Sequence, residues 1–204
     1  MRAADGKVRA HFGPIAQWLA KTPAKRIAEK RREADLLFHR VGITFAVYGD
    51  AQGAQQGAER LIPFDTIPRI IPKAEWDQLA RGLKQRVDAL NRFLDDIYHG
   101  QEILKAGAIP PDQVLKNAGF QKEMRGLELP NRVYSSIAGI DLVRHSDGKY
   151  YVLEDNLRTP SGVSYMIENR KMMMRLFPEL FERQTVLPVE HYPALLLETL
   201  RAAA

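Results

Sequence analysis

The dipeptide Asp147-Gly148 is the feature that most constrains the fold, because it separates two runs rich in β-branched and aromatic residues. Asp-Gly between such runs is the strongest short signal for a β-hairpin, and a two-residue loop fixes how the strands pair. The sequence therefore predicts a hairpin within residues 133–156. With Asp147-Gly148 as the whole loop, Leu142 is predicted to face Leu153.

The predicted pairing brings acidic side chains together. Asp141 falls directly opposite Glu154, and the Cβ atoms of such partners are about 4.5–5.5 Å apart. Asn156 lies two residues beyond Glu154, hence on the same face, opposite Gly139, which leaves room beside it. Two opposed carboxylates repel each other unless a cation lies between them, and this set of oxygen ligands suits Mg²⁺. A different loop length would shift the pairing and scatter the three side chains.

The residues that follow the hairpin suit an anionic ligand. Arg158 can supply a bidentate cation for phosphate or carboxylate. Ser161 and Gly162 end a Thr-Pro-Ser-Gly corner, and the helix predicted after it would offer unpaired backbone N–H groups to an anion. Metal ligands, a cation and a helix start in one region can together stabilise the charge of a transferring phosphoryl group.

Two further arginines are candidates for ligand binding. Arg69, in the segment PFDTIPRII, could bind a substrate carboxylate, or it could form a structural pair with Asp65. Arg170 lies one to two turns into the helix predicted after Gly162, so its guanidinium could reach back toward a phosphate.

The remaining chain mixes helical and extended patterns, which predicts an α+β fold with helices packed around the hairpin. Apolar residues recur at steps of three and four in four segments, residues 14–40 (with a break at Thr22-Pro23), 74–98, 163–182 (with a second piece from Pro178) and HYPALLLETLRAAA. Short helices are predicted within 111–126 and a strand over 43–48. Residues 49–60 are interpreted as a mobile loop, or alternatively as a lid over a ligand, and three prolines keep 61–72 extended. The apolar face of 74–98 and Met172–Met174 are expected in the core.

The composition narrows the class of protein. The 204 residues contain no cysteine, which excludes disulfides, thiolate nucleophiles and Cys-based zinc sites. No run approaches the roughly 20 apolar residues of a membrane helix, and the first residues lack the apolar core of a signal peptide, so we expect a cytoplasmic protein without a membrane partner. The net charge of +5 would allow nucleic-acid binding, but no aromatic residues interleave the charged run 25–35, which argues for a solvated helix face.

Several segments of the chain resemble those of a known family. The segments EADLLFHRVGITFAVYGD, ERLIPFDTIPRIIP and YVLEDNLRTPSGVSYMIENR look like the N-terminal part of the circularly permuted ATP-grasp proteins, which are relatives of glutathionylspermidine synthase. The series Asp141, Glu154 and Asn156 is similar to the magnesium motif of ATP-grasp ligases. The resemblance extends over nearly the whole chain.

The resemblance implies a reaction and a role for each candidate residue. ATP-grasp enzymes hold ATP between two α+β subdomains and transfer its γ-phosphate to a carboxylate, and an amine then attacks the acyl phosphate. By this resemblance Asp141 and Glu154 would bind Mg²⁺, with Glu154 bridging two ions and Asn156 completing the second. Arg158 would steady the phosphate and the tetrahedral intermediate. Ser161 and Gly162 would contact substrate or phosphate.

The sequence also departs from the family pattern. In longer members the segment with the ATP-clasping lysines follows the magnesium motif, so residues 1–204 are expected to form an N-terminal portion of the domain. The first hypothesis is therefore part of an ATP-dependent carboxylate–amine ligase that uses Mg²⁺ and ATP. The second is a non-catalytic binding or interaction module that is a remnant of the ligase or works with a partner in trans. The partner expected for either is the missing C-terminal half or a second copy of the chain. The carboxylate and amine substrates cannot be read from the sequence.

Overall fold

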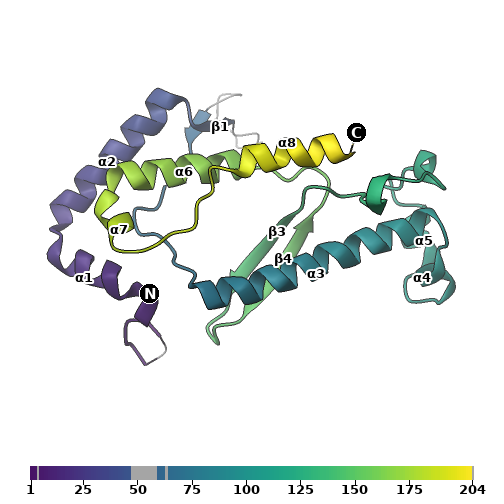
Figure 1. Ribbon diagram of the computed structural model, residues 1–204, viewed down its shortest axis with the longest axis horizontal. Helices are drawn as coiled ribbons and strands as arrows, with labels where there is room; N and C mark the ends of the chain where they lie inside the picture. The colour runs from purple at the N-terminus through teal and green to yellow at the C-terminus, as the bar shows by residue number, and fades with distance from the viewer. Residues whose placement is uncertain (4, 47–58, 63, 204) are drawn as a thin grey trace, which may run out of the picture. The chain divides into compact units, whose positions relative to one another are not determined.

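The computed structural model describes residues 1–3, 5–46, 59–62 and 64–203 (Figure 1). These residues divide into two compact units. Unit 1 consists of Met1–Pro72 and Ser161–Glu190, and unit 2 consists of Lys73–Pro160 and His191–Ala204. The predicted loop or lid over 49–60 lies almost entirely outside the described residues.

Unit 1 is mainly helical. Its elements are η1 (Ala10–Phe12), α1 (Gly13–Lys21), α2 (Ala24–Val41), β1 (Thr44–Ala46), β2 (Glu59–Leu61), α6 (Val163–Leu176) and α7 (Pro178–Glu182). The predicted helix break is confirmed, because extended backbone at Thr22 and Pro23 separates α1 from α2. β1 and β2 pair antiparallel, with Thr44 opposite Leu61.

The core of unit 1 joins segments that are distant in sequence. Phe38 of α2 is fully buried and packs in one cluster with Leu176 and Phe177, which end α6. The indole of Trp18 meets the ring of Phe177 edge-on, with centroids 5.4 Å apart, and its Nε1–H donates to Glu179 Oε1 at 3.1 Å. Met172 and Met173 are buried as predicted, but Met174 is 45% exposed.

Unit 2 is built on one long helix. Its elements are α3 (Lys73–Tyr98), α4 (Glu102–Lys105), α5 (Pro111–Leu115), η2 (Lys122–Met124), η3 (Pro130–Arg132), β3 (Gly139–Arg144), β4 (Tyr150–Asn156) and α8 (Tyr192–Ala203). The apolar stripe of α3 is buried only at Ile97 and Tyr98, and Trp76 is 41% exposed, so the expectation of a core face along the whole helix holds only at its end. Among the described residues, no helix combines the length and apolar character that a membrane span requires.

The predicted hairpin forms, but its turn is longer than predicted. His145 N–H donates to the Lys149 carbonyl at 2.9 Å, and Gly148 N–H donates to the His145 carbonyl at 3.0 Å. Three residues therefore form the loop, and the last, Gly148, adopts a φ of +87° that L side chains rarely accept. The two-residue turn was wrong, and Leu142 pairs with Val152 instead of Leu153.

A β-bulge compensates for the longer turn. The register shifts between Leu142, which pairs with Val152, and Asp141, which pairs with Glu154, so Leu153 is the extra residue of β4. Beyond the bulge Gly139 pairs with Asn156. The sequence prediction erred by one residue at the turn and missed a one-residue bulge. Because these two offsets cancel, the predicted pairing of Asp141 with Glu154 is confirmed.

Candidate metal centre

The three predicted metal ligands lie together on one face of the hairpin. Asp141, Glu154 and Asn156 are all exposed, whereas Ile140 and Asp155, which alternate with them, are partly buried. The amide of Asn156 donates from Nδ2 to Glu154 Oε1 at 2.9 Å. The amide oxygen of Asn156 and the second oxygen of Glu154 are thereby left as potential ligands.

Asp141 and Glu154 give this face of the hairpin a negative charge. Within the described part of the chain, neither Asp141 nor Glu154 forms an ion pair. Opposed carboxylates destabilise an antiparallel pair, so a cation held between them would relieve the repulsion. No group of three or more His, Cys, Asp or Glu suited to a metal occurs among the described residues, so the donor set is two carboxylates and an amide. This set fits Mg²⁺, which takes few protein oxygens and fills the rest of its shell with water or phosphate.

The candidate anion-binding residues belong to different units. Arg158 is exposed in unit 2, two residues beyond Asn156. Ser161 and Gly162 belong to unit 1, where Gly162 caps the start of α6 with a φ of +96°. The roles expected for Arg158, Ser161 and Gly162 therefore stay predictions.

The two additional arginines have different surroundings in unit 1. The guanidinium of Arg170 donates to the Leu187 carbonyl at 2.7 Å and lies over the ring of Phe181. Arg69 is exposed, and among the described residues it forms no ion pair with Asp65, whose carboxylate instead accepts the N–H of Ile67 at 2.9 Å. The local contacts thus favour a structural role for Arg170 more than for Arg69.

Gly139 is needed where the two strands end, because a Cβ there would lie 2.7 Å from Pro160 Cβ and 3.5 Å from Asn156 Cβ. We expect Gly139→Ala to displace Pro160 or Asn156 and to lower the free energy of unfolding by about 1–3 kcal/mol, measured by urea denaturation. Gly82→Ala is the matched control, since an added Cβ on this α3 residue meets nothing within 4 Å. The control should raise stability by up to about 1 kcal/mol. Equal effects at both sites would contradict the expected clash.

The opposite face of the hairpin is attached to α3 by two ion pairs that sequence reasoning missed. Arg86 donates from Nε to Asp155 Oδ1 at 2.7 Å and from a terminal nitrogen to Asp155 Oδ2 at 2.6 Å. Arg144 donates from Nε to Glu75 Oε1 at 2.8 Å. Figure 1 shows β3 and β4 running beside α3, which these contacts join to the hairpin. The sequence signal for these ion pairs is the spacing of Glu75 and Arg86. They are eleven residues, about three turns, apart and therefore lie on nearly the same side of the helix.

The Arg86 pair predicts the titration of Asp155. Hydrogen bonds from Arg86 hold the pKa of the Asp155 carboxyl below its usual range. Because the folded pKa is the lower one, this pair stabilises the fold above the ordinary aspartate pKa and loses its effect as the pH falls through the folded pKa. In a carbon NMR titration we expect the Asp155 midpoint to rise toward the ordinary value in Arg86→Met. An identical midpoint in both proteins would contradict this assignment.

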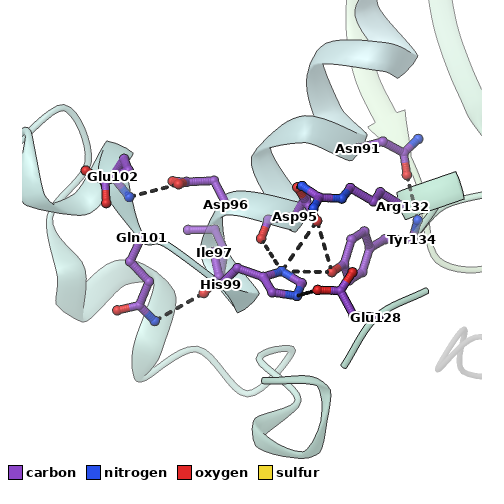
Figure 2. A network of polar contacts seen from close by, with 10 residues as sticks. All are labelled: Asn91, Asp95, Asp96, Ile97, His99, Gln101, Glu102, Glu128, Arg132 and Tyr134. Atoms are coloured by element: carbon purple, nitrogen blue, oxygen red, sulfur yellow. Dashed lines mark hydrogen bonds and ion pairs between the residues drawn. The ribbon is translucent and has the colours of Figure 1, made fainter. Parts of the chain in front are cut away.

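A polar network fixes the segment that leads into β3 (Figure 2). Asn91 Oδ1 accepts the N–H groups of Tyr134 and Ser135, both at 2.8 Å. Ser135 is buried, and its hydroxyl donates to the Leu157 carbonyl at 3.1 Å, directly after Asn156. The end of the candidate site is therefore connected to α3 through Ser135.

The second part of this network surrounds His99, which follows the last residue of α3. His99 Nδ1 lies 2.9 Å from the Asp95 carbonyl oxygen and 3.4 Å from Tyr134 Oη, and Arg132 forms an ion pair with Asp95 at 3.0 Å. Burial, and next the charge of Asp95, raise the pKa of the Tyr134 phenol. Figure 2 shows these side chains converging from α3 and the segment before β3.

Comparison with known proteins gives a consistent match. A sequence model described as a circularly permuted ATP-grasp matches residues 68–204. An uncharacterized protein of Synechocystis sp. is 45% identical over 197 residues, and an uncharacterized protein of Mycobacterium leprae is 42% identical over 200 residues. A protein of Frankia alni named "Putative glutamate--cysteine ligase 2-3" is 39% identical over 203 residues.

In each comparison the match covers nearly all of this chain but less than half of the relative. They cover 97% of this chain and 40% of the Synechocystis protein, and 98% of this chain and 34% of the Mycobacterium leprae protein. For the Frankia protein the shares are 98% and 22%. Most of each relative therefore lies outside the region that this chain matches.

Proposed function

This chain belongs to the circularly permuted ATP-grasp family, and from that premise we propose that it supplies the magnesium-binding half of the site of an ATP-dependent carboxylate–amine ligase. The observation that carries the proposal is the pairing of Asp141 with Glu154, with Asn156 on the same face. The name of the Frankia relative, a glutamate–cysteine ligase, supports the same reaction class. Since only 22% of that protein is matched, we adopt from it the class of bond formed and not its substrates.

The proposed site works mainly by holding charge in place. Asp141 and Glu154 would hold Mg²⁺ through carboxylate oxygens, with Asn156 as an amide ligand. Bound Mg²⁺ would supply Lewis-acid stabilisation of phosphate charge. Arg158, a permanent cation, would orient the transferring phosphoryl group, and the start of α6 with Ser161 and Gly162 would donate backbone N–H groups to an anion.

The reaction class can be tested through its acyl phosphate. We expect the whole protein to convert ATP to ADP only when Mg²⁺ and a suitable carboxylate are present. Hydroxylamine should then trap the acyl phosphate as a hydroxamate, which is detected by mass spectrometry. Glutamate with cysteine is a first substrate pair to try, because the Frankia relative carries that name.

The non-catalytic alternative gives a different result in the same assay. A binding module would form neither ADP nor hydroxamate with any carboxylate, even where calorimetry detects binding of Mg²⁺ and ATP. Localisation in the cytoplasm and a homo-oligomeric state remain part of the proposal and are tested by fractionation and by sedimentation.

A further inference from the structure

We propose that Arg86, together with Glu75, is a positioning residue that locks the bulged register of the hairpin and so keeps Glu154 and Asn156 on the same face as Asp141. This inference rests on the proposed metal site for its functional consequence. Its structural content stands on the geometry of α3 and the hairpin alone.

The bulge decides which side chains reach the candidate metal face. If the pairing of Arg144 with Tyr150 continued without a bulge, Asp141 would face Leu153 and Ile140 would face Glu154. A one-residue slip moves every side chain of a strand to the opposite face. In the straight register Asp155 would therefore turn to the metal face, and Glu154 and Asn156 would turn toward α3.

With Arg144 opposite Tyr150, as the three-residue turn places it, the two ion pairs with α3 form together only in the bulged register. Arg144 pairs with Tyr150, so these two side chains share the face that meets α3. Asp155 is five residues beyond Tyr150, and in a regular strand an odd step reverses the face. The extra residue at Leu153 restores Asp155 to the α3 side, where Arg86 binds it.

The helix presents its two partners at a fixed spacing. Glu75 and Arg86 are eleven residues apart, which returns nearly to the same side of an α-helix after three turns. One pair forms on each side of the bulge, Glu75 with Arg144 near the turn and Arg86 with Asp155 near the strand end. With the three-residue turn in place, a rigid helix that engages both points can bind both at once only when β4 contains the extra residue.

The geometry of the Arg86 pair suits a lock. Both oxygens of Asp155 accept from the planar guanidinium, which fixes the carboxylate in orientation as well as position. The side chain of Asp155 is 18% exposed and that of Arg86 is 43% exposed, so the carboxylate is the more sheltered partner of the pair. Register is weakly specified where neither face of a strand is buried, and an isolated two-stranded hairpin is only marginally stable, so this hairpin needs such a restraint.

The test uses Arg86→Met in the full chain, with Arg81→Met as the matched control. Arg81 is an exposed arginine of the same helix that forms no ion pair within the described part of the chain. Proton NMR contacts across the hairpin report the register, because with the three-residue turn Asp141 meets Glu154 in the bulged form and Leu153 in the straight form. Mn²⁺, a paramagnetic probe of the metal site, reports affinity.

We expect Arg86→Met to produce Asp141–Leu153 contacts and to weaken Mn²⁺ binding by about tenfold or more, while Arg81→Met changes neither. A charge swap, Arg86→Glu with Asp155→Arg, should recover the bulged register that Arg86→Glu alone loses. This recovery separates a positioning role from a general loss of folding.

The outcomes separate the two proposals. An unchanged register and unchanged Mn²⁺ affinity in Arg86→Met would overturn the lock. A shifted register in a chain whose parent binds no Mn²⁺ would support the lock and count against the metal site. A shifted register with undiminished Mn²⁺ affinity would overturn the assignment of Glu154 and Asn156 as ligands and leave the lock standing.

Discussion

Glu154→Gln is expected to abolish ATP turnover in the whole protein while leaving its fold unchanged. Gln has nearly the same shape as Glu and can still accept the hydrogen bond from Asn156, which now joins Asn156 Nδ2 to Glu154 Oε1 at 2.9 Å. Gln lacks the negative charge, so it cannot balance a divalent cation beside Asp141. Loss of several kcal/mol of charge stabilisation corresponds to about a thousandfold or greater fall in rate.

The measurement is the rate of ADP formation at saturating Mg²⁺, with circular dichroism to check the fold. Glu123→Gln is the control, since Glu123 is an exposed glutamate of the short helix η2 in the same unit. A wild-type rate in Glu154→Gln would eliminate the proposed metal role. A loss of activity in both variants would show that removal of a surface charge is enough, and would also count against a specific role for Glu154.

The second large effect concerns stability and falls on Phe38. This side chain has no exposed surface, lies in the core of unit 1 and meets the ring of Phe64 edge-on at 5.4 Å between centroids. Phe38→Ala removes the buried ring and leaves a cavity that the close-packed surroundings cannot fill completely. We expect the free energy of unfolding to fall by about 3–5 kcal/mol.

The stability change can be followed by the fluorescence of Trp18, which is buried in the same core. Because the chain has two tryptophans, the measurement is made in a Trp76→Phe background. Leu36→Ala serves as the control, since Leu36 lies on the same helix and is 61% exposed. A loss below about 1 kcal/mol for Phe38→Ala would mean that Phe38 does not lie in a closely packed core.

Much of the secondary structure followed from the sequence because local signals determine it. The apolar stripe of 74–98 predicted α3, which spans Lys73–Tyr98, and Pro178 was correctly read as the start of a second helical piece. The mixture of helices and small antiparallel sheets is the predicted α+β class, and the family resemblance is confirmed over residues 68–204. The helix signals depend on backbone preference and on hydrophobic periodicity, which act over short stretches of sequence.

The tertiary structure decided what the local signals left open. Asp-Gly indicated a turn but not its length, and nothing in the strand sequence marked Leu153 as the extra residue of a bulge. The bulge is compatible with the contacts that Arg144 and Asp155 make with Glu75 and Arg86. These two helix residues precede the hairpin by more than fifty residues. The sequence by itself determined that Asp141, Glu154 and Asn156 sit near the ends of two paired strands. The turn length and the bulge appear only in the tertiary structure, because each offsets the register by one residue and a single-residue offset reverses the face of a strand.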